Sequence, residues 1–310
     1  VFKIDLSQSQ TIRLEVIFNK YLQDTDILVS DADGKELLRF SPASINWNRR
    51  IITLPPGVST VSLRSTSGIS GEYLIRYVFL SKQSGGQKIW EFPLYGNYSS
   101  PAIAGNRIFA SGGSSLYCLD SVSGANIWDF QAGSEISSSP MVYAGRVYVA
   151  TWYGRIYSID SRAGSKVWSV NVRGESGHAS PAISDGRLYI ASRYSDMEQQ
   201  VGVVSCLDLE TGETIWEYET SGYIYGSPAV GDGKVFIGAE YRSNNMSFGK
   251  VYILDAGTGA RLKEYLTGAA IYSSPAYRDG IIYIGCNDGK IYAIDANENS
   301  LVWSFDTGNS

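Results

Sequence analysis

Downstream of about Lys88, hydrophobic and polar positions alternate in short runs that end at turn residues. The clearest runs follow one another as Ser139–Tyr143, Arg146–Ala150, Arg155–Ile159 and Lys166–Val170. A period of two residues, with many β-branched and aromatic side chains, is typical of half-buried strands. The pattern therefore predicts four consecutive β-strands joined by tight turns.

This four-strand pattern recurs in one register along the rest of the chain. Each copy opens on a Ser-Pro pair, and the pairs are Ser100-Pro101, Ser139-Pro140, Ser180-Pro181, Ser227-Pro228 and Ser274-Pro275. An aspartate follows in every copy, at Asp120, Asp160, Asp208, Asp255 and Asp295. Tandem four-stranded units of roughly 40–45 residues are the sequence signature of β-propeller blades. We therefore predict an all-β fold with a β-propeller of about five four-stranded blades.

Each aspartate begins a turn between the third and fourth strands of its copy. Its carboxylate can accept hydrogen bonds from the amides that follow, and a glycine later in the turn can take a positive φ at little steric cost. These glycines are Gly124, Gly164, Gly212 and Gly259, with Asn299 in the last copy.

Tryptophans mark the outermost predicted strands. The series is Trp90, Trp128, Trp168, Trp216 and Trp303. We assign them a structural role, because an indole on the outer strand can fill the space between neighbouring blades. Lys263 takes the tryptophan's place in the fourth copy, which is therefore predicted to be the most weakly packed.

The copy number leaves closure of the ring open. Five copies predict a five-bladed ring, and closure by the chain ends would pair Ile89–Glu91 with the last blade. Alternatively, Asp306–Ser310 resembles the segment that precedes a blade, and in that interpretation the chain is part of a longer array.

Two motifs of the repeat are specific enough to compare with known families. They are Gly-Lys-Ile-Tyr-Ala-Ile-Asp at Gly289–Asp295 and Thr-Gly-Glu-Thr-Ile-Trp at Thr211–Trp216. Both are similar to the pyrroloquinoline-quinone (PQQ) type repeat, and the resemblance covers about residues 88–310. That family contains PQQ-dependent dehydrogenases, and also cofactor-free propellers such as the lipoprotein of the outer-membrane barrel assembly machinery. The resemblance therefore implies the fold and leaves the function open.

The segment before the repeats predicts a separate domain. Strand-like runs lie at Thr11–Phe18, Ile27–Val29, Glu36–Phe40, Arg50–Leu54, Thr60–Arg64 and Tyr73–Leu80. They predict a small β-sandwich or jelly roll over 1–83, with the propeller over 84–310 and Ser81–Gln87 as linker. Three stretches, Asp24–Asp31, Leu54–Gly57 and Ser70–Tyr73, are similar to the pre-peptidase C-terminal domain of secreted bacterial and archaeal proteins. Some such domains bind calcium, but we interpret Asp24, Asp26 and Asp31 as ordinary turn and edge residues. A competing interpretation makes the segment two degenerate blades.

The charge and the apolar stretches of the chain limit the classes of partner and location that we expect. The 310 residues carry a net charge of −5 without a run of Lys or Arg, which excludes the basic face of a nucleic-acid binder. No apolar stretch is long enough to be a transmembrane segment. The chain begins with Val1, so we expect a processed or trimmed product from which a signal peptide or anchor could have been removed.

No pattern in the chain predicts catalysis. Cys118 and Cys206 precede the turn aspartate by two positions, where small residues pack, and Cys286 takes a similar place, so we interpret them as structural. PQQ dehydrogenases typically carry adjacent cysteines and a carboxylate and amide set that holds calcium. Neither set can be placed here, so we predict no catalytic residue and neither PQQ nor calcium as cofactor. A quinoprotein dehydrogenase, or a fragment of one, is the alternative function.

One face of the propeller is predicted to gather aromatic and basic side chains. The candidates before the Ser-Pro pairs are Tyr98, His178, Tyr225 and Tyr272, and those in the hairpins between second and third strands are Trp152, Arg193, Tyr194, Tyr241 and Arg242. The hairpin turns are longer in the third and fourth copies, at Arg193–Gly202 and Glu240–Gly249. Such residues dominate recognition sites, although tyrosine also simply suits propeller loops. The sequence thus predicts a non-catalytic propeller that binds a protein or carbohydrate, and the family resemblances imply an extracytoplasmic location.

Overall fold

The computed structural model describes the side chains of residues 89–94, 99–195, 200–242 and 246–308, and the strand backbones of other segments. The chain divides into two compact units, Val1–Ile89 and Trp90–Ser310. Every named element is a β-strand. Among the described residues there is no helix that could cross a membrane.

The first unit contains seven strands in two sheets. They are β1 Phe2–Lys3, β2 Thr11–Phe18, β3 Thr25–Asp31, β4 Glu36–Phe40, β5 Arg49–Leu54, β6 Val58–Ser65 and β7 Tyr73–Leu80. The strand orders are β1-β6-β3-β4 and β5-β2-β7, which differ from the consecutive order of a blade. The interpretation as two degenerate blades is therefore wrong. The sandwich and the pre-peptidase resemblance stay predictions, and the side chains of Asp24, Asp26 and Asp31 lie outside the described residues.

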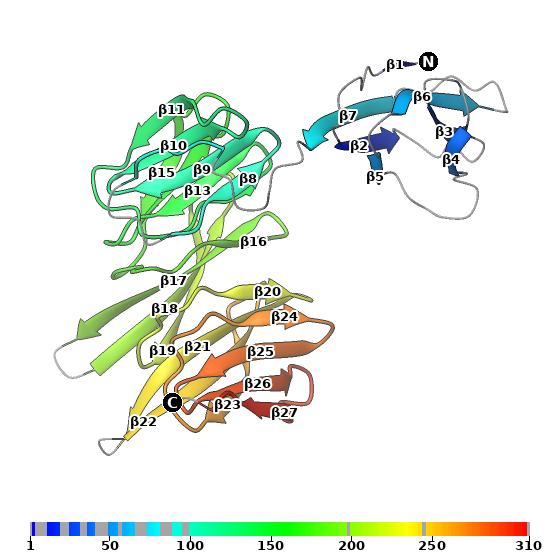
Figure 1. Cartoon of the computed structure of the whole chain (residues 1–310). Helices are drawn as coiled ribbons and strands as arrows, with labels where there is room; N and C mark the ends of the chain where they lie inside the picture. The colour runs from blue at the N-terminus through cyan, green and yellow to red at the C-terminus, as the bar shows by residue number, and fades with distance from the viewer. Residues whose placement is uncertain are drawn as a thin grey trace. The chain divides into compact units, whose positions relative to one another are not determined.

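The second unit consists of five four-stranded antiparallel sheets, which confirms the predicted propeller blades (Figure 1). Blade 1 contains β8 Ala102–Ala104, β9 Arg107–Gly112, β10 Ser115–Asp120 and β11 Asn126–Gln131; blade 2 contains β12 Met141–Tyr143, β13 Arg146–Ala150, β14 Arg155–Asp160 and β15 Lys166–Asn171. Blade 3 contains β16 Ala182–Ser184, β17 Arg187–Asp196, β18 Gln199–Asp208 and β19 Thr214–Ser221; blade 4 contains β20 Ala229–Gly231, β21 Lys234–Ser243, β22 Met246–Asp255 and β23 Arg261–Thr267. Blade 5 contains β24 Ala276–Arg278, β25 Ile281–Cys286, β26 Lys290–Asp295 and β27 Ser300–Asp306.

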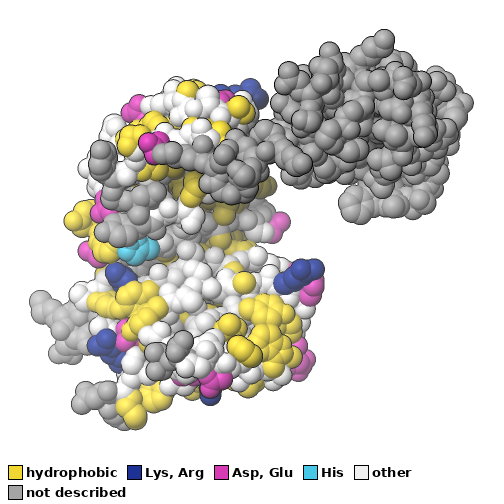
Figure 2. Space-filling view, in the orientation of Figure 1, with side chains coloured by type: hydrophobic (Ala, Val, Ile, Leu, Met, Phe, Trp, Pro, Cys, Tyr) yellow, Lys and Arg dark blue, Asp and Glu magenta, His cyan; other side chains and the backbone are white. Residues whose placement is uncertain are grey.

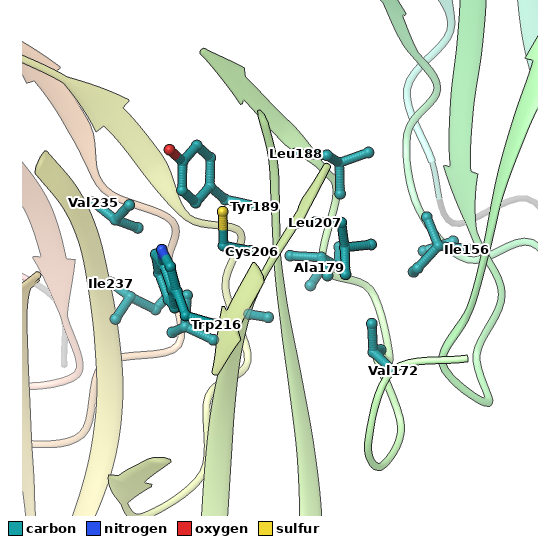
Figure 3. Packing of buried hydrophobic residues seen from close by; sticks show 14 of the residues in the cluster. Ile156, Val172, Ala179, Leu188, Tyr189, Cys206, Leu207, Trp216, Val235 and Ile237 are labelled. Atoms are coloured by element: carbon teal, nitrogen blue, oxygen red, sulfur yellow. The ribbon is translucent and has the colours of Figure 1, made fainter. Parts of the chain in front are cut away.

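The hydrophobic core consists of the layers between blades. In blade 3, Tyr189, Cys206 and Trp216 face Val235 and Ile237 of blade 4 (Figure 3). Leu188 and Leu207 point to the other side of the same sheet, toward blade 2 (Figure 3). Strand alternation therefore buries both faces of a central blade, so that apolar residues occupy consecutive positions.

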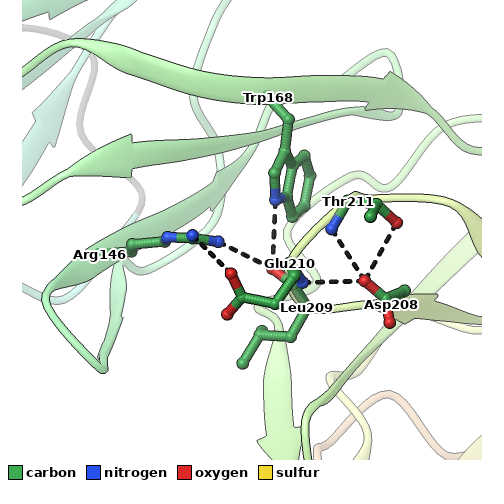
Figure 4. Close-up of polar contacts among 6 residues, drawn as sticks. All are labelled: Arg146, Trp168, Asp208, Leu209, Glu210 and Thr211. Carbon is green, nitrogen blue, oxygen red and sulfur yellow. Dashed lines mark hydrogen bonds and ion pairs between the residues drawn. The ribbon is translucent and has the colours of Figure 1, made fainter.

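Four tryptophans connect the blades. Three lie on the outer strands of blades 1 to 3, and Trp90 precedes blade 1 and, unlike the prediction, lies on no strand. Their indole N–H groups donate to the carbonyl after the turn aspartate: Trp90 to Ser121 at 3.2 Å, Trp128 to Ser161 at 3.3 Å, Trp168 to Leu209 at 3.1 Å and Trp216 to Ala256 at 3.1 Å. Figure 4 shows Trp168 above this turn, where Arg146 donates to the same carbonyl and pairs with Glu210. The backbone amide and the hydroxyl of Thr211 both donate hydrogen bonds to Asp208. The amide bond, and to a smaller extent the hydroxyl bond, lowers the pKa of that carboxyl.

The glycine of each turn lies directly beneath the indole. A Cβ atom on Gly212 would come within 2.7 Å of the Trp168 ring, and φ there is +78°. The turn therefore requires glycine for two reasons, backbone conformation and the absence of a side chain. The last turn has Asn299 instead, at φ 57°, and it faces the blade in which Lys263 replaces tryptophan. A side chain is tolerated there because no indole covers the turn.

Lys263 donates a hydrogen bond to the turn of the next blade, as the indole N–H does at the other junctions. Its ammonium donates to the Asn297 carbonyl, which belongs to the same turn that an indole would reach. This hydrogen bond lies at an exposed position of the blade junction. Asn299 also crosses the junction, donating from Nδ2 to the Glu264 carbonyl at 2.9 Å.

The serines of the Ser-Pro pairs form a second connection between blades. Each backbone N–H donates to the serine hydroxyl of the following blade: Ser100 to Ser139 and Ser139 to Ser180 at 2.9 Å, and Ser180 to Ser227 and Ser227 to Ser274 at 2.8 Å. These bonds hold the innermost strands in register, which explains why the pair recurs in every copy.

The fifth blade does not join the first through either connection among the described residues. β27 pairs only with β26, and all of its residues are exposed. Trp303 is 45% exposed, whereas Trp168 and Trp216 are each 9% exposed. Residues 89–91 form no strand, so they do not pair with the last blade as closure by the chain ends requires.

We predict that the tryptophan contact dominates the stability of each blade junction. Trp168→Ala should lower the free energy of unfolding by about 3–5 kcal/mol, because it removes a buried aromatic side chain. Lys263→Ala should lower it by less than about 1 kcal/mol, the typical value of one hydrogen bond. Urea unfolding of both variants provides the comparison, and equal losses would contradict the assigned packing role.

We also predict that positions 263 and 299 are energetically coupled. Lys263→Trp alone should not stabilise the fold, since its indole meets the Asn299 side chain. Combined with Asn299→Gly, the indole can stack on the turn as in the other blades. A double-mutant cycle should then give a favourable coupling of about 1–3 kcal/mol. Additive effects in the cycle would show that the glycine and indole are independent.

Candidate functional site

The loops into the first strands and the hairpins between second and third strands meet on one side of the propeller. One residue of each hairpin donates its backbone N–H to the loop that enters the same blade. These bonds are Trp152 to Glu135, Arg193 to Glu175 and Glu240 to Tyr223, all at 2.8 Å, and Asn287 to Ala270 at 3.0 Å. The repeat therefore presents one variable side chain per blade at an equivalent position.

Six side chains on this side form a continuous set of contacts, which we call the aromatic–arginine cluster. Its members are Trp152, His178, Arg193, Tyr223, Tyr225 and Tyr272. Trp152 and His178 meet edge to face with centroids 5.0 Å apart. Tyr225 meets Tyr272 in the same way at 4.7 Å. The cluster extends from the hairpin of blade 2 to the loop that enters blade 5.

Arg193 lies at the centre of the cluster. Its guanidinium carbon is 4.6 Å from the Tyr225 ring centroid, 5.9 Å from that of Tyr223 and 6.0 Å from that of Trp152. These are cation–π distances, and the rings come from blade 2 and from the loop into blade 4. The arrangement holds a cation between neighbouring blades.

Glu240 is buried next to the cluster, and the sequence analysis did not predict it as a site residue. Its side chain is 1% exposed, and it accepts hydrogen bonds from Arg242 and Ser247 at 2.9 Å and from the Tyr225 hydroxyl at 3.4 Å. A buried carboxylate is stable only when it is paired and hydrogen bonded in this way. Burial and the Glu240 charge raise the pKa of Tyr225, while the hydrogen bond to Glu240 raises the pKa of Arg242.

The sequence did contain a signal for Glu240. Counting from the first residue of the second strand, the equivalent positions are Trp152, Arg193, Glu240 and Asn287. The predicted candidates of the fourth copy, Tyr241 and Arg242, begin one residue after this position. An acidic residue at a position occupied elsewhere by Trp and Arg would have indicated a buried polar network.

Two predicted candidates lie away from the cluster because side chains alternate along a strand. Tyr194 follows Arg193 and contacts Arg173, whose guanidinium carbon is 4.9 Å from its ring, and Glu219. Tyr241 precedes Arg242 and lies 4.3 Å from the Lys250 ammonium. Tyr98, the remaining candidate, lies outside the described residues.

The longer turns expected in the third and fourth copies are continuous hairpins. β17, β18, β21 and β22 each have ten residues, and Arg193 pairs with Gly202 within the ladder. Both hairpins extend to the same side of the propeller (Figure 1). They are strands because backbone pairing continues past the blade, so Arg193 and Glu240 sit on regular secondary structure.

The cluster is suited to recognition rather than to bond chemistry. His178 and Tyr272 are exposed, and Figure 2 shows the histidine at the surface beside hydrophobic and basic side chains. Burial raises the pKa of the Cys118 and Cys286 thiols and raises that of Cys206 to about 11, so none is an activated nucleophile. Exposed aromatic and arginine side chains supply contact area and directed hydrogen bonds.

The residues present do not fit PQQ with calcium. The three cysteines lie in three different blades, all as free thiols, so no adjacent pair exists. In the described part of the chain, no group of three or more His, Cys, Asp or Glu side chains could hold a metal ion. We therefore derive no reaction step through this cofactor.

Comparison with known proteins gives partial matches of two kinds. Quinohemoprotein alcohol dehydrogenase ADH-IIG of Pseudomonas putida is 26% identical over 163 residues, which are 46% of this chain and 23% of that protein. Outer membrane protein assembly factor BamB of Moranella endobia is 28% identical over 124 residues, which are 34% of this chain and 32% of that protein. The chain thus spans less than a third of the length of either relative.

The crystal structure of BamB from Moraxella catarrhalis has a similar fold. It superposes with a TM-score of 0.55 at 18% identity, over 68% of this chain and 65% of that one. The family profile described as outer membrane protein assembly factor BamB matches residues 77–176 and 153–310. Because these segments cover well over half of the sequence, the chain belongs to the BamB family of PQQ-like repeat β-propellers.

Proposed function

We propose that this protein is a non-catalytic, extracytoplasmic scaffold that binds a protein partner through the aromatic–arginine cluster. The observation that carries the proposal is the continuity of the cluster from blade 2 to blade 5, with Arg193 at its centre. Interfaces are enriched in Trp, Tyr and Arg at the positions that contribute most to binding. The name of the BamB relatives, an assembly factor, agrees with a protein partner.

Family membership supports the proposed extracytoplasmic location. BamB is named as an outer membrane protein assembly factor, so a relative with the same repeat is expected on that side of the cytoplasmic membrane. A carbohydrate would also contact exposed aromatic rings, and it is distinguished from a protein in the first experiment below.

A quinoprotein dehydrogenase is the second candidate, and similarity to ADH-IIG is the observation in its favour. The donor set argues against it, because the three thiols lie in different blades and two of the carboxylates already have partners. Glu240 pairs with Arg242, and Asp208 accepts the amides of its own turn. We therefore propose that the propeller binds its partner without PQQ or calcium.

We predict that a photo-crosslinking amino acid at Tyr272 will capture one protein species in the native host. The matched control is Tyr143, which is 47% exposed against 43% for Tyr272 and lies beside the turn at the opposite end of the strands. Mass spectrometry identifies the adduct. Equal capture at both positions, or capture of glycans alone, would contradict the proposal.

We predict no turnover after reconstitution with PQQ and calcium. Purified protein is incubated with both, and dye-linked dehydrogenase activity is then measured on alcohols and sugars. Stoichiometric PQQ binding together with turnover would replace the scaffold by the quinoprotein alternative.

A further inference from the structure

Arg193 differs from most arginines of the second unit in what it contacts. Five others pair with a carboxylate, namely Arg146, Arg173, Arg242, Arg261 and Arg278. Arg107 and Arg187 instead donate to turn carbonyls. Among the described residues, the guanidinium of Arg193 has only aromatic rings as partners, although the residue is partly buried.

The nearby carboxylates do not neutralise it. Glu240 has its own donors in Arg242, Ser247 and Tyr225. Glu175 lies opposite Arg193 in an isolated β-bridge, but its side chain is exposed and forms no ion pair with Arg193 within 4.0 Å. The cation therefore keeps its hydrogen-bonding capacity.

Three aromatic rings lie around the Arg193 guanidinium. Rings that interact through their π faces do not use its N–H groups, which lie in the plane of the guanidinium. A Cβ atom built on Gly177 would lie 3.6 Å from Nη2, in ordinary contact, so this glycine lies beside the group and has no side chain to cover it. An immobilised arginine loses little entropy on binding, and its planar fork matches the two oxygens of a carboxylate.

We propose that Arg193 is a receptor for a carboxylate on an acidic peptide segment of the binding partner. The inference rests on the proposed function, because it names the chemistry of the partner at the same cluster. The carboxylate would accept a bidentate hydrogen bond from Arg193, and the apolar part of the segment would pack on Trp152 and Tyr225. A peptide is favoured over nucleic acid because the chain has a net charge of −5 and the cluster presents a single unpaired guanidinium.

The test uses N-acetylated, C-amidated hexaglutamate as the probe and hexaglutamine as its uncharged match. The full chain is labelled with ¹⁵N, and the Nε–Hε resonance of Arg193 is assigned by its loss in Arg193→Lys. Hexaglutamate should shift this resonance and hexaglutamine should not. The affinity should fall at least tenfold in Arg193→Gln and in Arg193→Lys, since lysine keeps the charge but lacks the fork.

Two control variants make the outcome specific. Arg278→Gln removes an exposed charge outside the cluster and should leave hexaglutamate binding unchanged. Glu175→Gln should bind as tightly as the unmodified protein or more tightly. Equal binding by Arg193→Gln, or binding that occurs only after Glu175→Gln, would overturn the proposal. Thermal unfolding of each variant confirms that the fold is retained.

Failure of this inference is distinguishable from failure of the proposed function. If the Tyr272 crosslink persists in Arg193→Gln, the protein-binding face stands and the carboxylate receptor is wrong. If the crosslink never forms although hexaglutamate binds at Arg193, the anion site stands and the scaffold function is wrong.

Discussion

The contact between an indole and the turn of the next blade is the interaction on which this propeller depends. A four-stranded sheet with two apolar faces cannot bury either face alone, so each blade needs its neighbours. The indole covers apolar surface, and its N–H satisfies a turn carbonyl, while glycine beneath it allows close approach. Lys263 and Asn299 confirm this logic by exception: where the indole is missing, the glycine is missing as well.

Regular junctions between blades place equivalent backbone positions on one side of the molecule, and chemistry can then vary from blade to blade. Trp152, Arg193 and Glu240 occupy the same position in three successive blades, and each donates the same backbone hydrogen bond. Their side chains have different tasks: a ring that borders a cation, the cation itself, and a buried anion. The fold therefore repeats although the candidate site does not, which is the usual relation between a scaffold and its function.

The sequence was sufficient for the blades because each copy encodes its own strands and turns locally. Five of the candidates, including His178 and Arg193, are also members of the cluster, since their loops recur at a fixed distance from the Ser-Pro pair, whereas Tyr223 was not predicted. Glu240 was missed because burial of a carboxylate depends on donors from another strand, such as Ser247 of β22. Tyr194 and Tyr241 lie away from the cluster because side chains alternate along a strand, and interpreting the hairpins as turns could not predict that alternation.

Arg193 in the cluster and Glu240 beside it have separate roles, which are recognition and support. If Glu240 paired with Arg193, the cluster would be neutral and saturated, and its arginine would only stabilise the fold. Instead Arg242, two residues along the same strand, pairs with Glu240. Glu240 thereby orients the Tyr225 hydroxyl, and the Tyr225 ring in turn lies 4.6 Å from the Arg193 guanidinium. Glu240 thus holds the Tyr225 ring in place, and that ring holds the Arg193 guanidinium. The N–H groups of Arg193 stay available to the binding partner.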